Sequence, residues 1–208
     1  DNKNTDKIKH RYNRISDLYD LVEKPMENLF SKHRKDLLSN AYGDVLEVGT
    51  GTGNNFQYYP DSVAVTAIDF SPKMVAIASS KATEFHHIKN VSEMNAEHMS
   101  FDDNTFDTVV AACVFCSVAN PVQGLKEIKR VCKNEGTILM LEHVRSKKTV
   151  LAPLMDILNF IPLHMFGANI NRDTVKNLHK AGFTNISVKN LWLDILKLIV
   201  IKNDKGKR

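Results

Sequence analysis

Three closely spaced glycines, Gly49, Gly51 and Gly53, follow directly after an apolar run at residues 45–48. Such a run ending in glycines predicts a buried strand followed by a tight turn. Glycine lets the backbone approach a ligand closely and present its N–H groups to it. In parallel sheets, ligands bind at the carboxyl ends of strands. The run therefore predicts a small-molecule site, with a plain tight turn as the alternative.

The spacing of these glycines excludes two common phosphate-binding loops. A dinucleotide-binding turn requires G-x-G-x-x-G, but counting from Gly49 or Gly51 places Asn54 or Phe56 at the third glycine position. The chain also lacks the G-x-x-x-x-G-K-[ST] loop. Asp69 ends the next apolar run, and a carboxylate there can accept both hydroxyls of a ribose. A nucleoside fits this pattern better than a pyrophosphate.

The rest of the chain predicts strands that alternate with helices. Apolar runs rich in β-branched residues predict strands, and apolar residues at steps of three or four predict helices. Strands are expected at 44–48, 63–68, 85–91, 106–112, 137–141, 186–188 and 195–201. Helices are expected at 7–22, 25–39, 72–82, 122–132 and 173–181, with a turn at 134–136.

This alternation predicts an α/β fold with a Rossmann-like, mainly parallel sheet of seven strands and helices on both faces. The last two strands are too close in sequence for a helical crossover, so they should form a hairpin with one antiparallel strand at an edge.

Composition and cysteine count point to an ordinary globular domain. Of 208 residues, 43% are hydrophobic and 25% charged, and the net charge of +4 permits contact with an anionic membrane without requiring it. Three cysteines are a poor count for a disulfide framework, so we expect a reducing, cytoplasmic location. Cys113 and Cys116 have a redox or metal spacing, but Cys132 alone cannot complete a structural zinc site. Buried cysteines and no metal are expected.

The motifs together resemble those of class I S-adenosylmethionine (SAM)-dependent methyltransferases. The glycine run and Asp69 resemble the first two motifs of that family, and residues 95–101 resemble the segment that lies against the adenine. Residues 107–110 and 127–136 resemble the fourth strand and the helix and turn before the fifth. Asn95 stands where most members have aspartate, and an asparagine can still hydrogen-bond an adenine amine.

The resemblance implies SAM as the cofactor and a set of residues that bind it. These residues are Glu47, Gly49, Thr50, Gly51, Gly53, Asn54, Asn55, Asp69, Phe70, Met74, Asn95, Ala96, Glu97 and Cys113. Glu47 has two readings, since it can hold the amino end of the ligand or brace the glycine loop. The implied domain is single and spans 1–208, with N-terminal lid helices at 1–40, a SAM-binding core at 41–145, and an acceptor lid and final strands at 146–208.

Shorter motifs resemble narrower groups. Residues 12–20 resemble the N-terminal lid of quinone C-methyltransferases and of small soluble bacterial phosphatidylethanolamine N-methyltransferases. Residues 115–118, 142–146 and 167–174 resemble the second group more, and membrane-associated thiol methyltransferases of animals share parts of the first two. The implied acceptor is the amine of phosphatidylethanolamine or a related lipid. The alternatives are C-methylation of a quinone precursor and S-methylation of a small thiol.

Four polar residues are candidates to handle the acceptor. A phospholipid amine must lose a proton before attack, and Tyr12, Tyr19 and His143 are candidates to orient the nucleophile or relay that proton. Core packing is the alternative for both tyrosines, and a structural hydrogen bond is the alternative for His143. Arg172 can bind a lipid phosphate, or it can lie in solvent beside a helix that Asn171 caps.

The apolar, proline-interrupted segment 151–166 predicts a lid above the methyl donor. With the basic N-terminal helix it can also contact an anionic membrane surface peripherally, and ordinary packing between this lid and the core is the alternative. We expect a monomer with a small-molecule or lipid acceptor. No nucleic-acid partner is expected, because the chain lacks an Asn/Asp-Pro-Pro-Tyr motif and an appended basic domain. A SAM-binding module without catalysis is a further alternative.

Overall fold

The computed structural model describes residues 7–14, 31–144, 172–191 and 195–206. Within these ranges, residues 7–14 and 31–38 are helical, as parts of the first two predicted helices. Tyr19, Asn171 and the predicted lid at 151–166 lie outside the described residues. In the described part of the chain, no helix has the length and apolar character needed to cross a bilayer.

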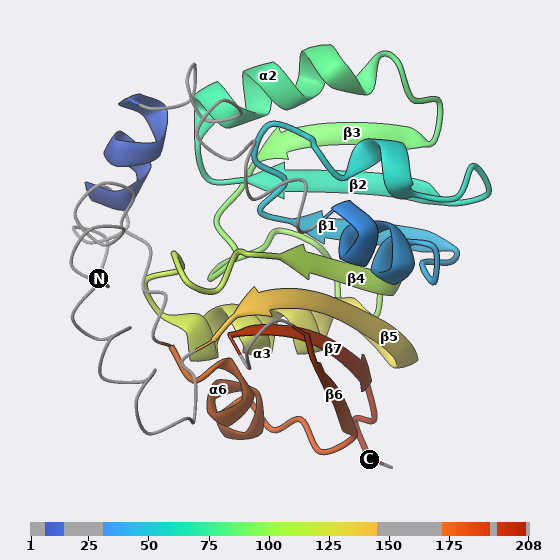
Figure 1. Cartoon of the computed structure of the whole chain (residues 1–208), viewed down its shortest axis with the longest axis vertical. Helices are drawn as coiled ribbons and strands as arrows, with labels where there is room; N and C mark the ends of the chain where they lie inside the picture. Colours follow the sequence, from blue (N-terminus) through green and yellow to red (C-terminus); the bar gives the residue numbers. More distant parts are fainter. Residues whose placement is uncertain (1–6, 15–30, 145–171, 192–194, 207–208) are drawn as a thin grey trace.

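A seven-stranded sheet forms the centre of the molecule (Figure 1). Its spatial order is β3-β2-β1-β4-β5-β7-β6, so the strand order reverses between β1 and β4. A site at this reversal is open at the carboxyl ends of both strands. The strands are β1 (Asp44–Val48), β2 (Ala64–Asp69), β3 (Ile88–Glu93), β4 (Phe106–Ala112), β5 (Cys132–His143), β6 (Ile186–Asn190) and β7 (Leu196–Lys202).

The first five strands pair in parallel, and β7 is antiparallel to both of its neighbours. Met140 of β5 lies opposite Ile199 of β7, and Val188 of β6 also pairs with Ile199. The predicted hairpin and its antiparallel strand are therefore confirmed, with β6 outermost and β7 inserted beside β5. This arrangement gives β5 a partner on both sides.

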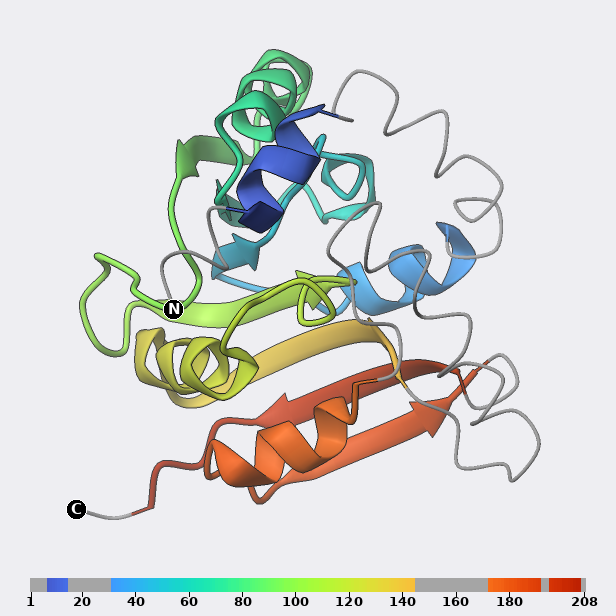
Figure 2. The ribbon, with the colours of Figure 1, turned by 90° about the vertical axis from the view of Figure 1, so that its left-hand side faces the viewer.

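Helices cover both faces of the sheet (Figures 1 and 2). On one face, α3 (Pro121–Val131) and α6 (Thr174–Lys180) contribute Leu125 and Leu178 to an apolar cluster. On the other, helix 31–38 and α2 (Pro72–Ala82) contribute Leu38 and Ala78 to a second cluster. These two cores hold the strands rigidly and confirm the predicted fold class.

Two predicted boundaries differ from the structure by three residues or more. The strand predicted at 85–91 begins at Ile88, because residues 86–87 form a turn before it. The strand predicted at 137–141 begins earlier, at Cys132, so β5 runs through the residues of the predicted turn at 134–136. The pairing of β4 with β5 shifts register here, and Glu135 has a φ of 60°. A local bulge thus absorbs the turn-forming residues without ending the strand.

Candidate functional site

The loop after β1 has three glycines with positive φ values, but the surroundings of these glycines differ. A Cβ on Gly49 (φ 68°) would lie 2.6 Å from Cγ2 of Val114, so the packed Val114 side chain leaves no room for a larger residue here. A Cβ on Gly51 (φ 56°) would meet nothing within 4 Å. Gly51 therefore leaves open space beside the loop, where a bound molecule can touch the backbone.

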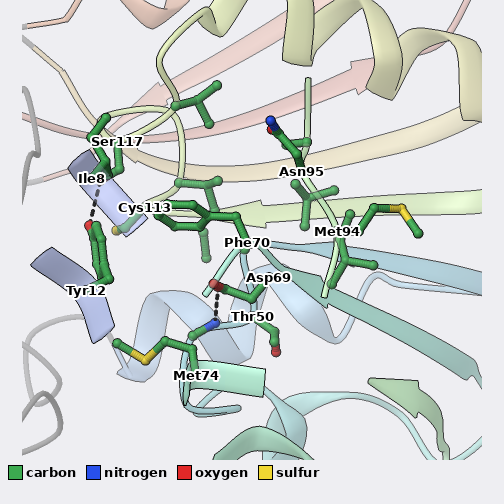
Figure 3. Close-up of a pocket in the computed structure, with 18 of the residues that line it drawn as sticks. Ile8, Tyr12, Thr50, Asp69, Phe70, Met74, Met94, Asn95, Cys113 and Ser117 are labelled. Carbon is green, nitrogen blue, oxygen red and sulfur yellow. Dashed lines mark hydrogen bonds between the residues drawn. The ribbon is translucent and has the colours of Figure 1, made fainter. Parts of the chain in front are cut away.

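Asp69, at the end of β2, faces this loop from the neighbouring strand (Figure 3). Its Oδ2 accepts a hydrogen bond from Gly51 N, and its Oδ1 accepts one from Ser71 N, both at 2.9 Å. Burial raises the pKa of the carboxyl group, and these hydrogen bonds oppose the rise. Each carboxylate oxygen can accept a second hydrogen bond. Asp69 can therefore hold the loop and bind a pair of ligand hydroxyls at the same time.

A cavity of about 930 Å³, including its open mouth, lies at the carboxyl ends of β1, β2 and β4. Of the residues predicted to bind the cofactor, those that line it are Gly49, Thr50, Gly51, Asn54, Asn55, Asp69, Phe70, Met74, Asn95, Ala96, Glu97 and Cys113. Glu47 and Gly53 do not line it.

Glu47 lies buried beneath the glycine loop in a polar network. Its Oε1 accepts from Asn55 Nδ2 at 2.9 Å, its Oε2 accepts from the Tyr59 hydroxyl at 3.0 Å, and Arg34 donates to Asn55 Oδ1 at 3.0 Å. Burial raises the pKa of Glu47 to about 7 despite these hydrogen bonds. Of the two roles weighed for Glu47, these contacts support bracing of the loop.

Apolar side chains form one part of the cavity wall. Phe70, Met74, Met94 and Ala96 all line it, from the segments that follow β2 and β3 (Figure 3). Nearby, Asn95 Oδ1 accepts a hydrogen bond from Glu97 N at 2.9 Å, which fixes the turn. This wall can hold a flat, largely apolar ring beside the carboxylate of Asp69.

The loop after β4 is held by a buried carboxylate. Glu142 Oε1 accepts hydrogen bonds from the backbone N–H groups of Val114 and Phe115, at 3.1 and 3.2 Å. Burial raises the pKa of Glu142 to about 8. Cys113, at the start of this loop, has a φ of 58°. A left-handed conformation is costly for a residue with a Cβ, so the surrounding contacts must enforce it.

Arg172 also holds this loop. Its Nη1 donates to the carbonyl oxygens of Phe115 and Val118, at 2.8 and 2.5 Å. The side chain is half-buried and does not line the cavity. The alternative prediction, that Asn171 caps the following helix, was wrong. Asp173 is the N-cap of α6, and its Oδ1 accepts a hydrogen bond from Lys176 N at 3.0 Å.

Two of the three catalytic candidates lie among the described residues. Tyr12 lines the cavity, with its hydroxyl 2.6 Å from Ser117 Oγ and its ring edge-to-face with Phe70 (Figure 3). His143 ends β5, with Nδ1 3.8 Å from Cys113 Sγ. Burial, with a smaller effect of Arg34, lowers the pKa of His143 to about 4, so the ring is neutral at neutral pH.

The three cysteines are free thiols. Burial raises the pKa values of Cys116 and Cys132 to about 12, so neither offers a reactive thiolate. Sequence reasoning identified Cys113 for the cavity but missed Ile8, Arg34 and Ser117, which also line it. Ile8 and Arg34 belong to helices far from the glycine motif, and nothing local marks them. Ser117 lies in segment 115–118, which the sequence marks only through its resemblance to a family.

Comparison with known proteins agrees with this geometry. A family model described as "Methyltransferase domain" matches residues 46–140. A phosphatidylethanolamine N-methyltransferase of Cereibacter sphaeroides is 41% identical over 112 residues, which cover 53% of this chain and 55% of that enzyme. The thiol S-methyltransferase TMT1B of Rattus norvegicus is 32% identical over 82% of this chain and 72% of its own length.

A solved structure has the same fold. It is a chain in the complex between the Haloferax volcanii Trm112 methyltransferase activator and a methyltransferase, with a TM-score of 0.72 and 19% identity. The match covers 93% of this chain and 97% of that one. At this identity the match establishes the fold alone.

Proposed function

Since the chain belongs to the methyltransferase-domain family of SAM-dependent enzymes, we propose that it methylates the amine of phosphatidylethanolamine or of a closely related lipid. The 41% identity with a phosphatidylethanolamine N-methyltransferase is the main support for this acceptor. That alignment spans only about half of the length of the relative, so the activity of the whole relative is carried over as a proposal.

The cavity fits the cofactor in shape and chemistry. The open space beside Gly51 admits a ligand against the loop backbone, Asp69 offers acceptors to ribose hydroxyls, and the wall around Phe70 suits an adenine ring. When bound, SAM supplies a methyl group on a sulfonium that is already a good electrophile. The protein must therefore align the acceptor with that methyl group and exclude water, and such alignment can lower a barrier by roughly 7–11 kcal/mol in favourable cases.

Tyr12 and Ser117 are the groups that we assign to the acceptor. An amine that attacks through its lone pair keeps N–H groups that need acceptors, and two hydroxyl oxygens 2.6 Å apart at the cavity wall can provide them. Both residues line the cavity, and a hydroxyl oxygen can accept more than one hydrogen bond. This role accounts for a hydrogen bond between residues that are far apart in the chain.

His143 suits a secondary role. A ring with a pKa near 4 is a weak base, so it cannot by itself deprotonate an ammonium group with a pKa near that of lysine, about 10.4. We assign it to positioning Cys113, whose sulfur lies 3.8 Å away. The acceptor would then reach the methyl group as the minor, neutral form of the amine, which is already in protonation equilibrium with bulk solvent.

Thiol methylation is the second candidate, because the alignment with the thiol S-methyltransferase extends over 82% of this chain. A thiolate needs no N–H acceptors, so the Tyr12 hydroxyl would be dispensable for it. A quinone precursor is the remaining alternative.

The test is a methyl-transfer assay with radiolabelled SAM and three acceptors in parallel: phosphatidylethanolamine vesicles, a quinol analogue and a small alkyl thiol. Asp69→Ala serves as the control that removes the proposed ribose contact. Label in the lipid that disappears with this variant supports the proposal. Label only in the thiol or the quinol contradicts it and selects the corresponding alternative.

We also propose that the chain is a single-domain monomer with lid helices at 1–40, a SAM-binding core at 41–145, and an acceptor lid and final strands at 146–208. We further propose that it contacts anionic membrane peripherally. The basic residues of helix 7–14 support this contact, since Lys7, His10 and Arg14 are exposed. Co-sedimentation with vesicles that contain anionic lipid tests the contact. Equal recovery with purely zwitterionic vesicles would contradict it.

A further inference from the structure

Two histidines and a carboxylate meet at the end of the sheet opposite the cofactor cavity. Asp61 lies just before β2, and His86 and His87 lie just before β3. One ligand atom from each of the three comes within 4.8 Å of the other two. The cavity lies at the carboxyl ends of β1, β2 and β4, so this cluster is separate from the proposed methyl-transfer site. Its test does not depend on the proposed function.

The hydrogen bond on the other side of the His87 ring decides where its proton lies. His87 Nε2 is 2.9 Å from the carbonyl oxygen of Phe56. A carbonyl oxygen can only accept, so Nε2 must carry hydrogen and donate it. In the neutral ring, Nδ1 is then a bare lone pair. A ligating histidine usually donates its other N–H to a carbonyl or carboxylate in this manner, which fixes the tautomer for a metal.

The free nitrogen of His87 points into the cluster. Nδ1 is buried and has no hydrogen-bond partner, while Oδ1 of Asp61 lies 3.6 Å from it. The His87 residue is only 3% exposed and its ring packs edge-to-face against Tyr59 and His86. A lone pair that faces a carboxylate oxygen is stabilised only when a cation lies between them. That cation is either a proton or a metal ion.

We propose that Asp61, His86 and His87 form a binding site for a transition-metal cation of the zinc class. Zn²⁺ takes imidazole nitrogen and carboxylate oxygen as ligands at about 2.0–2.2 Å, and three protein ligands leave one position for water. In such a tetrahedral site the ligand atoms are roughly 3.4 Å apart. Asp61 and His86 are exposed and can rotate toward the fixed nitrogen of His87.

A metal ion here would also act on the cofactor side of the molecule. Binding through Nδ1 polarises the imidazole and strengthens the hydrogen bond from Nε2 to Phe56. Phe56 begins η1 (Phe56–Tyr58), the short helix directly after the glycine loop, and a Cβ on Gly53 would touch its ring. The ion would therefore stabilise the turn that supports the loop.

Isothermal titration of the full chain, without a histidine tag, with ZnCl₂ tests the site. We expect one ion per chain, and affinity at least about tenfold lower in Asp61→Asn and in His86→Asn. Both positions are exposed, so these variants leave the buried His87 ring in place. His179→Asn, at an exposed histidine of α6, is the matched control and should bind as the unmodified chain does. Mg²⁺ should not compete, because it prefers an all-oxygen site.

Thermal unfolding gives a second readout. At one fixed concentration, Zn²⁺ should raise the melting temperature of the unmodified chain and of His179→Asn by more than it raises that of Asp61→Asn and His86→Asn. The proposal is overturned if the unmodified chain binds no zinc, or if both cluster variants bind it as tightly as the control. In either case no metal ion would link Asp61 and His87.

Discussion

Asp69 accepts a hydrogen bond from the backbone N–H of Gly51 at 2.9 Å, across two adjacent parallel strand ends. The carboxylate that we assign to the ribose of SAM is thus also the group that holds the glycine loop. Removal of this carboxylate is therefore expected both to weaken ligand binding and to disorder the glycine loop.

Asp69→Asn should weaken SAM binding by roughly 10- to 100-fold, from the loss of charge-assisted hydrogen bonds worth about 1.5–3 kcal/mol. An amide has one acceptor oxygen, so it cannot accept from both Gly51 N and Ser71 N as the carboxylate does. Isothermal titration with SAM measures the change. Asp102→Asn, at an exposed position, is the control. Equal affinity in both variants would show that Asp69 does not contact the ligand.

Two glycine substitutions should separate folding from binding. Gly51→Ala adds a Cβ in open space, so the protein should fold with a strain of about 1–2 kcal/mol, yet lose SAM affinity because the methyl group occupies the ligand's position. Gly49→Ala should be far less stable, because its Cβ would lie 2.6 Å from Val114. Urea denaturation and SAM titration of both variants check this. A Gly51→Ala protein that binds SAM normally contradicts the assigned pose.

Tyr12→Phe removes the hydroxyl that lies 2.6 Å from Ser117 and keeps the ring on Phe70. If the hydroxyl orients the acceptor amine, kcat should fall by roughly 10²-fold while the Kd for SAM stays unchanged. Tyr42→Phe, at an exposed tyrosine, is the control. Unchanged kcat on the lipid would support the packing role for Tyr12. Loss of activity on the lipid but not on a thiol would separate the two acceptor candidates.

Glu142→Gln should change how stability depends on pH. Burial raises the pKa of Glu142 from 4.5 to about 8. The contribution of this group to folding stability is therefore fully present below pH 4.5, and it is lost as pH rises toward 8. Within this window the loss is about 1.4 kcal/mol per pH unit. The Gln variant lacks this loss, so its free energy of unfolding should increase relative to that of the unmodified protein as pH rises. Urea denaturation at several pH values measures the difference, with the exposed Glu84→Gln as control. A pH-independent difference contradicts the prediction.

Arg172→Lys tests whether this residue holds the loop or binds a lipid phosphate. Because Nη1 donates to the carbonyl oxygens of Phe115 and Val118, the variant should lose about 1–3 kcal/mol of folding free energy. Its activity should fall equally on acceptors with and without a phosphate. A KM increase limited to the phospholipid, with unchanged stability, would instead support phosphate binding.

The sequence predicted the part of the site that follows a local pattern. Gly51 closely follows one apolar run and Asp69 ends the next, so their place at the carboxyl ends of β1 and β2 could be inferred from the predicted strands alone. The contacts of Arg34 with Asn55, and of Arg172 with Phe115, join segments far apart in the chain. No periodicity encodes such pairs. The turn-like residues near Glu135 misled because Cys132 before them and Thr137 after them both pair with β4, so the strand continues through a bulge despite their local preference.

The position of β7 has a consequence for synthesis of the chain. This strand follows β6 in sequence, yet it lies between β5 and β6 in the sheet. While the ribosome is still making β7, β5 therefore has an unpaired edge of exposed backbone N–H and C=O groups, which can pair with another nascent chain. β6 cannot protect that edge alone, because its partner is β7. Interruption of translation before residue 196 should thus yield aggregating fragments, even though the cofactor-binding strands are complete.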